Sequence, residues 1–390
     1  MSLSVGIVGL PNVGKSTLFN ALLKRQAALV ADYPFTTIEP NVGTVPVEDE
    51  RVSKLGRIVE EESKAAPKVV QATVKFVDIA GLVAGAHKGE GLGNQFLGHI
   101  RGCNLICHVL RGFENSGVVK AGSVSPIDDL KTVRTELILK DLEAVGKIKN
   151  EKLKIKNYNS KFKIVLEKIG ATLNKGGMLN KLDFSEEEEN LIRDLFLLTI
   201  KPEIFVLNVD EDKLGKINEG DSIFLFQHPT SPMQHQGSSP HLRGGRIGED
   251  KIEIKKEDIV VLSAKLESEL GSLSEKDQQL YLKELGAKES VLEKLVKRAY
   301  KKLGLISFFT TTGGHEVRAW TIKKGSSAIE AAGIIHSDFA ERFIKAKVIT
   351  TDDFIKAGGW TKAKELGKIR FEGRDYKIKE GEVVEFVIGN

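Results

Sequence analysis

The sequence predicts an α/β protein in which a mostly parallel sheet, covered by helices on both faces, precedes a smaller β-rich part. The first observation is a series of short apolar runs separated by helical stretches, at Ser4 to Val8, Val74 to Val77, Leu105 to Val109, Ile204 to Leu207 and Ile259 to Leu262. Runs of this length are typical of strands that are buried on both faces of a parallel sheet. The other two observations are a long helical region within this series and a change of pattern after Leu305.

The helical region lies between the third and the fourth predicted strand. Leu130 to Lys168 carries apolar residues at helical spacing, and Glu186 to Leu198 is a second predicted helix, with Ser185 as its N-cap. The residues Asn174-Lys175-Gly176-Gly177 form the break between them. We therefore expect a helical, coiled-coil-like insert over residues 130–200.

The last part of the chain has the pattern of a small β-rich domain. The predicted strands are Glu316 to Ile322, Lys368 to Phe371, Tyr376 to Ile378 and Val383 to Ile388, and the predicted helices are Ala328 to Gly333 and Asp338 to Ile344. Residues 217–250 have no period and are expected to form a mobile loop. This gives a first domain over residues 1–304 and a second over residues 305–390.

Composition excludes several classes of protein. Of the 390 residues, 41% are hydrophobic and 29% are charged, which is ordinary for a soluble protein. No apolar run approaches the roughly 20 residues that a membrane-spanning helix needs. The start Met1-Ser2-Leu3-Ser4 has neither a basic stretch nor a cleavage site, so we expect a cytoplasmic protein without a membrane partner. Cys103 and Cys107 are expected to be buried thiols.

A phosphate-binding motif follows the first predicted strand. The residues Gly9-Leu10-Pro11-Asn12-Val13-Gly14-Lys15-Ser16 match the P-loop pattern at every fixed position and lead into a helix that begins at Thr17. Its glycines let backbone N–H groups surround phosphate, with Asn12, Val13, Gly14 and Thr17 close to the ligand. Lys15 would contact the β- and γ-phosphates, and the Ser16 hydroxyl would bind Mg²⁺.

Two further motifs predict the rest of the magnesium site. Asp78-Ile79-Ala80-Gly81 follows a strand, so the Asp78 carboxylate can hold the metal while the Gly81 N–H bonds the γ-phosphate. Thr37, in the loop after the P-loop helix, is the predicted residue that closes on Mg²⁺. These residues predict a P-loop fold of the GTPase type, in which the loops around Thr37 and Gly81 respond to the γ-phosphate.

The motif expected to read the base departs from that of GTPases. GTPases carry Asn-Lys-x-Asp at the end of the corresponding strand, whereas this chain has Asn208-Val209-Asp210-Glu211. Glu211 is one methylene longer than the aspartate that binds guanine, and Val209 replaces the lysine that covers the base. Asn208 could still meet the adenine 6-amino group. The residues Ser263-Ala264-Lys265 end another strand and are expected to face the purine, so the predicted ligand is ATP.

Together these motifs resemble the Obg-like ATPase (YchF) family over nearly the whole chain. Further specific segments are Tyr33 to Asn41, Gly89 to Asn94, Glu316 to Thr321 and His336 to Phe339. The resemblance implies a nucleotide domain, a helical insert and a C-terminal β-grasp (TGS) domain, arranged around a cleft suited to RNA. It also implies Mg²⁺, with K⁺ as a second candidate cofactor, and a monomer that binds ribosomes and, through them, ribosomal RNA.

The expected hydrolysis lacks one familiar residue. Leu82 follows Gly81, where Ras-like enzymes have the glutamine that orients water. The family usually places a histidine after Phe113-Glu114-Asn115, and the aligned residue here is Lys120, which becomes the candidate catalytic group. We expect an ATP-hydrolysing switch that links nucleotide state to translation or stress response. A GTPase and a binding module regulated by nucleotide occupancy with negligible turnover are the alternatives.

Overall fold

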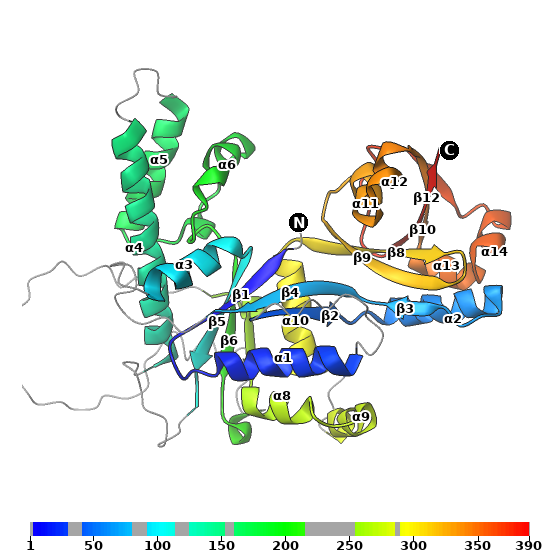
Figure 1. Ribbon diagram of the computed structural model, residues 1–390, viewed down its shortest axis with the longest axis horizontal. Coiled ribbons are helices and arrows are strands. Elements are labelled where there is room, and N and C mark those ends of the chain that lie inside the picture. The colour runs from blue at the N-terminus through cyan, green and yellow to red at the C-terminus, as the bar shows by residue number, and fades with distance from the viewer. Residues whose placement is uncertain are drawn as a thin grey trace, which may run out of the picture. The chain divides into compact units, whose positions relative to one another are not determined.

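The computed structural model describes residues 3–29, 41–79, 92–113, 125–152, 160–214, 254–284 and 289–389. Within these residues the chain forms two six-stranded sheets with helices around them (Figure 1). The predicted fold class is confirmed: a mostly parallel sheet carries a helical insert, and a second sheet follows it along the chain. None of the helices in the described ranges is long and apolar enough to cross a membrane.

The first sheet contains every strand predicted from the buried apolar runs. Its strands lie in the order β2 (Val42–Val47), β4 (Ala72–Asp78), β1 (Ser4–Val8), β5 (Leu105–Arg111), β6 (Glu203–Asn208) and β7 (Ile259–Leu262). The strands from β4 to β7 pair in parallel. Because parallel strands all end at the same edge of the sheet, the residues that follow β1, β4, β6 and β7 are brought together there.

Helices α1 (Lys15–Leu29) and α8 (Ala264–Leu270) contact each other beside this sheet (Figure 1). Helix α3 (Leu92–Gly102) leads into β5, and α9 (Glu275–Glu284) follows α8 along the chain. Cys103 and Cys107 are both buried and free, as predicted.

The helical insert has an apolar core of its own. Helices α4 (Pro126–Lys152) and α5 (Ser160–Asn174) contact each other, and α5 ends at the predicted break (Figure 1). Phe162, Val165 and Ile169 of α5 are buried in this core. The short helices η2 (Leu179–Lys181), α6 (Glu186–Ile192) and η3 (Arg193–Leu195) complete it.

Two helix boundaries in the insert differ from the prediction. The helical pattern from Leu130 to Lys168 belongs to two helices, because α4 ends at Lys152 and α5 begins at Ser160. The helix predicted to reach Leu198 ends at Ile192, and after one turn of η3 the backbone at Phe196 becomes left-handed, with φ 48°. The predicted cap is confirmed, since the Ser185 side chain accepts the Glu188 N–H in a capping box.

A buried ion pair holds the insert to the sheet. Arg134 of α4 donates two hydrogen bonds to Glu203 of β6, at 3.1 and 2.7 Å, and His108 Nε2 of β5 lies 2.8 Å from the same carboxylate. Burial alone would raise the pKa of Glu203, but the hydrogen bond from His108 and the charge of Arg134 lower it far below its usual range. Asn180 Nδ2 also donates to Glu203 Oε2 at 3.1 Å, so Glu203 is a buried anion that His108, Arg134 and Asn180 stabilise.

The second sheet has the order β11 (Arg370–Glu372), β10 (Phe343–Thr350), β12 (Glu382–Ile388), β8 (Leu305–Thr312), β9 (Glu316–Lys323) and β3 (Lys68–Val70). Helices α11 (Ala328–Ile335) and α12 (Ser337–Glu341) lie on one face, where Ala331 and Ala332 pack into a core with Phe308, Val348 and Val384. The remaining helices near this sheet are α2 (Glu50–Ser63), α10 (Val291–Lys302), α13 (Thr351–Ala357) and α14 (Trp360–Glu365).

Two predictions for this sheet are wrong in detail. The helix predicted over Asp338 to Ile344 ends at Glu341, and Phe343 already begins β10, where its buried ring joins the sheet core. Tyr376 to Ile378 does not form a strand within the described residues; Lys377 makes an isolated bridge with Ser327. Tyr376 is instead fixed by its side chain, which donates to Glu382 Oε1 at 2.7 Å.

Contacts divide the chain into two compact units that do not follow its linear order. The first unit comprises residues 1–43 and 75–292, and the second comprises residues 44–74 and 293–390. Helix α2 and strand β3 therefore belong with the C-terminal sheet, where β3 pairs in parallel with β9. The predicted domains, residues 1–304 and 305–390, are continuous segments of sequence, and the boundary between them at 304/305 stays a prediction.

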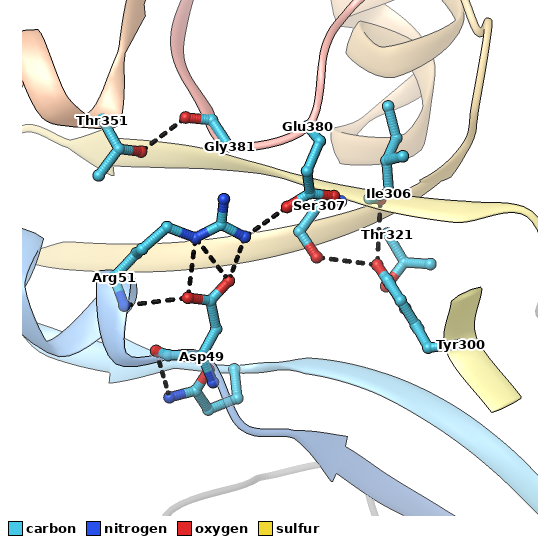
Figure 2. Close-up of polar contacts among 10 residues, drawn as sticks. Asp49, Arg51, Tyr300, Ile306, Ser307, Thr321, Thr351, Glu380 and Gly381 are labelled. Atoms are coloured by element: carbon cyan, nitrogen blue, oxygen red, sulfur yellow. Dashed lines mark hydrogen bonds and ion pairs between the residues drawn. The ribbon is translucent and has the colours of Figure 1, made fainter. Parts of the chain in front are cut away.

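An arginine at the start of α2 connects this early segment to the C-terminal sheet (Figure 2). The Arg51 guanidinium donates to Asp49 at 2.9 and 2.6 Å and also to Glu380, whose second oxygen accepts the Ser307 N–H at 2.9 Å. Burial opposes the charge of Arg51, but the hydrogen bonds that its guanidinium donates to Asp49 and Glu380 outweigh that effect and raise the pKa of Arg51. The guanidinium also lies 5.1 Å from the centre of the Phe309 ring.

Replacing Arg51 with leucine should loosen the attachment of residues 44–74 to the C-terminal sheet. The change leaves Asp49 and Glu380 without their cation, and because the Arg51 side chain is 35% exposed we expect a loss of about 1–2 kcal/mol rather than that of a buried pair. Hydrogen exchange measured by mass spectrometry should show faster exchange in α2 and β3. Lys54→Leu, at an exposed position on the same helix, is the control, and equal exchange in both variants would contradict this role.

Candidate nucleotide-binding site

The P-loop has the backbone geometry that its glycines and asparagine allow. Asn12 and Gly14 have φ angles of 61° and 99°, and α1 begins at the next residue, Lys15. A side chain at Gly14 would collide with the Asn208 amide, so both the positive φ and the available space require glycine. The loop therefore directs the N-terminus of a 15-residue helix toward the ligand site, where its dipole favours phosphate.

Lys15 is held inside the P-loop. Its side chain is 7% exposed, and Nζ donates to the Leu10 carbonyl at 2.8 Å. Burial lowers the pKa of Lys15, and the charge of Asp78 partly offsets that effect. The phosphates of a bound nucleotide would provide the additional negative charge that stabilises this buried ammonium group.

Ser16 and Asp78 come together as predicted for a metal site. The Ser16 hydroxyl donates to Asp78 Oδ2 at 3.0 Å, although the two residues lie on α1 and at the end of β4. The other carboxylate oxygen, Oδ1, is buried and has no hydrogen-bond partner among the described residues. A buried anionic oxygen beside a serine hydroxyl is the donor set that Mg²⁺ or its bound water takes, so these residues fit the ion.

Asn208 joins two loops of the site. Its Nδ2 donates to the Val13 carbonyl at 2.9 Å, and its Oδ1 accepts the Ala264 N–H at 2.9 Å. The residue is 6% exposed. Both polar atoms of the amide therefore bond to backbone groups of the protein. This gives Asn208 the role of positioning the P-loop against the Ser263-Ala264-Lys265 turn. Its contact with adenine stays a prediction.

The base end of the site is built at the ends of β6 and β7. Val209 is 2% exposed, and its N–H donates to the Leu262 carbonyl at 2.9 Å. Glu211 lies in the short helix η4 (Glu211–Lys213). Ser263 caps α8 by accepting the Leu266 N–H at 3.4 Å, so Ala264 and Lys265 form the first turn of that helix.

A cavity of about 500 Å³ connects the phosphate end to the base end. This volume falls within the roughly 300–1,000 Å³ of small-molecule sites. Its predicted lining residues are Asn12, Gly14, Lys15, Ser16, Thr17, Asn208, Val209, Glu211, Ser263, Ala264 and Lys265. Val13 contributes through its carbonyl bond to Asn208. Thr37, Gly81, Leu82, Lys120 and the loop 217–250 lie outside the described residues.

Two residues of the cavity wall were not predicted from the sequence. Asp210 belongs to the base motif itself, whereas Phe113 follows β5 and reaches the cavity from a third strand end. The Arg111 guanidinium lies over the Phe113 ring, 4.6 Å from its centre. Phe113 reaches the cavity because β5 and β6 are neighbours in the sheet, and the sequence alone carries no signal for that order.

Two family models match separate parts of the chain. The model for 50S ribosome-binding GTPases matches residues 4–168, and a C-terminal YchF-GTPase model, described as a protein of unknown function, matches residues 305–389. The ribosome-binding ATPase YchF of Bacillus subtilis (strain 168) is 42% identical over 392 residues, which cover 99% of both chains. The chain belongs to the YchF family.

Other YchF proteins are also similar to this chain over nearly its whole length. The ribosome-binding ATPase YchF of Escherichia coli O157:H7 is 42% identical over 394 residues, and again 99% of each chain is covered. The structure of the Schizosaccharomyces pombe YchF GTPase superimposes with a TM-score of 0.81 at 31% identity, covering 99% of this chain and 98% of that one. The resemblance inferred from the motifs is therefore confirmed, and this YchF chain shares its fold with a solved relative.

Proposed function

We propose that this protein is an ATP-hydrolysing switch that binds ribosomes in the cytoplasm. The observation that carries the proposal is one cavity that is lined both by P-loop residues and by the base motif containing Val209 and Glu211. The names of its relatives, ribosome-binding ATPases, support both the nucleotide and the partner. Binding of ATP and Mg²⁺ would order the loops around Thr37 and Gly81, and hydrolysis would release them.

The phosphate end supports triphosphate chemistry. Lys15 and the N-terminus of α1 would bind and orient the phosphates, while Ser16 and Asp78 would hold the metal. A bound Mg²⁺ would supply positive charge that neutralises the negative charge developing as the phosphoryl group is transferred to water. The buried, unpartnered Asp78 Oδ1 is the feature of the described residues that favours a metal at this position.

The base end favours ATP over GTP. A GTP site keeps guanine by pairing its N1–H and N2 amine with an aspartate, and it rejects a base that leaves such a buried polar group unpaired. Here the carboxylate of Glu211 lies one methylene further from the backbone than that of an aspartate would. The buried Val209 provides no lysine side chain to cover the base. Phe113 instead gives the cavity an aromatic wall that any purine can contact.

Changing Val209 to lysine together with Glu211 to aspartate should move the preference toward GTP. The variant restores the guanine-reading pattern, so the ratio of the dissociation constants for ATP and GTP should rise by about tenfold, which is roughly 1.4 kcal/mol. Because Val209 is 2% exposed, Glu211→Asp alone is measured beside the double variant. Asp212→Ala, on the same turn but outside the cavity lining, is the control.

The unmodified protein decides between the proposed function and its rivals. Binding GTP a hundredfold more tightly than ATP, about 2.7 kcal/mol, would refute the ATP assignment and leave a GTPase. Binding of ATP without turnover, both with and without ribosomes, would leave a module regulated by occupancy. Turnover must be measured as well as binding, because Leu82 stands where Ras-like enzymes have the water-orienting glutamine and Lys120 stands where the family usually has a histidine.

A further inference from the structure

Two helices that contact each other begin at the two ends of the nucleotide cavity. Helix α1 begins at Lys15, at the phosphate end, and the first turn of α8, with Ala264 and Lys265, lines the base end. The two helices lie side by side (Figure 1). A nucleotide occupies both ends at once, so the distance between α1 and α8 decides whether its base and its phosphates can be bound together.

Near the cavity the two helices are joined through Asn208, and further along they approach each other closely. A side chain at Gly271, just after α8, would have its Cβ 3.2 Å from Lys24 Cβ of α1. Lys24 Nζ donates to the Ser268 carbonyl and to the Ser272 hydroxyl, both at 3.0 Å. These hydrogen bonds are exposed, so water competes with them and they contribute little to a fixed distance between the helices.

A buried bridge between the two helices lies beside these exposed contacts. Arg25 of α1 donates to the Ser290 hydroxyl at 2.6 Å. In the next residue, Val291, the backbone N–H donates to the Glu267 carboxylate of α8. Ser290 and Glu267 are 5% and 6% exposed. The segment Ser290-Val291, where α10 begins, therefore connects α1 to α8 through hydrogen bonds that are shielded from bulk water.

The cavity at this bridge has room for one water molecule and no larger ligand. Its volume is about 20 Å³, and a water molecule needs roughly 10–15 Å³. The residues that line it include Arg25, Glu267, Gly271, Ser290 and Leu292. None of these five residues lines the nucleotide cavity, so they can act on a bound nucleotide only through α1 and α8.

Glu267 is an acid in surroundings that oppose its charge. Burial raises the pKa of Glu267 to about 7, and the charge of Arg25 and the Val291 N–H offset only part of that effect. Tyr281 of α9 is also within electrostatic reach, since burial and the charges of Glu211 and Glu267 raise the pKa of Tyr281. An uncharged side chain of the same size would cost the fold less at this position, which favours a role of Glu267 in function over one in stability.

We infer that Arg25 and Glu267 are positioning residues for the nucleotide. Through Ser290 and Val291 they hold the base-binding turn of α8 at a fixed distance from the P-loop helix α1. Neither residue touches the ligand; together they let one nucleotide fit both ends of the cavity. The inference rests on the proposed nucleotide site but not on its preference for ATP, because GTP would also span both ends.

The test compares a ligand that spans both ends of the cavity with one that occupies only the phosphate end. Titration calorimetry of the full-length protein with ATP and with inorganic tripolyphosphate, each with Mg²⁺, measures both affinities. Glu267→Ala leaves the Val291 N–H without its acceptor and should weaken ATP binding about tenfold. Tripolyphosphate affinity should change by less than about twofold, because the P-loop is intact. Arg25→Met removes the bond to Ser290 and should show the same pattern.

Two further variants separate positioning from a general loss of structure. Glu267→Gln keeps an oxygen that accepts the Val291 N–H, so it should retain more ATP affinity than Glu267→Ala does. The double variant Arg25→Met/Glu267→Ala should bind ATP about as weakly as either single variant, because both residues act through the same segment. Glu269→Gln, which removes a carboxylate from an exposed position of α8, is the control and should leave both affinities unchanged.

Stability measured without nucleotide shows that the charge of Glu267 is not needed for folding. The folded protein binds the Glu267 proton more tightly than the unfolded chain does. The stability that this group contributes is therefore present below its usual pKa of 4.5 and is lost as the pH rises through about 7. Glu267→Gln avoids the buried anion, so at about pH 8 its thermal midpoint should be no lower than that of the unmodified protein. Any loss of ATP affinity in this variant is then not a loss of folding.

The two ligands give outcomes that decide the inference. Equal losses of ATP and tripolyphosphate affinity would overturn it, because the two residues would then support the P-loop alone. Unchanged ATP affinity in both Glu267→Ala and Arg25→Met would also overturn it. A preference of the unmodified protein for GTP would refute the proposed ATP function, but the same comparison with GTP in place of ATP would still decide the positioning role.

Discussion

Lys15→Ala is expected to lower the affinity of the protein for ATP at least tenfold. The side chain places a buried charge at the phosphate end of the cavity, and a hydrogen bond to a charged group contributes roughly 1.5–3 kcal/mol. Since the same charge stabilises the γ-phosphate during transfer, turnover should fall by more than binding does. Isothermal titration with ATP and Mg²⁺, together with a phosphate-release assay, measures both effects.

The stability of the nucleotide-free variant separates this role from a structural one. Burial lowers the pKa of Lys15, so the folded protein holds this charge at a cost that the alanine variant does not have. The thermal midpoint without nucleotide should therefore not fall, while the stabilisation that ATP gives should largely disappear. Lys54→Ala, at an exposed site in α2, serves as the control. A Lys15→Ala protein with normal ATP affinity would remove the P-loop assignment.

Asn208→Ala should weaken the binding of ATP and GTP by the same large factor. The substitution leaves the Val13 carbonyl and the Ala264 N–H without their partner, and each unsatisfied buried group costs about 1–3 kcal/mol. We expect a loss of about 30-fold or more for both nucleotides. Equal losses follow because the amide positions two loops that hold any purine nucleotide.

The ratio of the two losses distinguishes positioning from base recognition. If Asn208 reads the adenine 6-amino group, ATP affinity falls much further than GTP affinity, and the positioning role is refuted. Asn208→Asp provides an intermediate case, because it keeps the acceptor for Ala264 but loses the donor to Val13. Asn174→Ala, which removes an amide that donates to Gly170 in the insert, is the control.

The first sheet could be predicted because its strands are buried on both faces. Strands β5 and β6 are apolar along nearly their whole length, so they stand out in the sequence whatever their partners are. Strand β10 of the C-terminal sheet mixes buried and exposed residues along its length, so its pattern in the sequence is weaker. Phe343 and Ile344 were therefore read as the end of a helix, although they begin β10.

The sequence also contains a helical signal for α2. Val52, Leu55 and Val59 have helical spacing after the capping residue Asp49, and all three are buried. The pairing of β3 with β9 could not have been inferred, because Val70 and Arg318 lie far apart in the sequence and neither segment is distinctive.

Some parts of the candidate site could likewise be predicted from the sequence, and others could not. The P-loop and the Asp78 motif are each a continuous stretch of sequence, so their residue types and spacing are sufficient to identify them. Phe113 becomes part of the cavity only through the order of the strands, which the sequence does not state. Asn208 shows a further limit, since the motif identifies the residue but not the two backbone groups that its amide binds.

The placement of residues 44–74 in the C-terminal unit has a consequence for synthesis and truncation. During translation α2 and β3 are made early, but β9, to which β3 pairs, follows only about 250 residues later. A chain that stops before β9 would leave Val52, Leu55 and Val59 of α2 without the sheet that α2 contacts. Deleting the C-terminal residues should thus cause aggregation of the part that remains. A soluble fragment would have to join residues 44–74 to residues 293–390 through a designed linker.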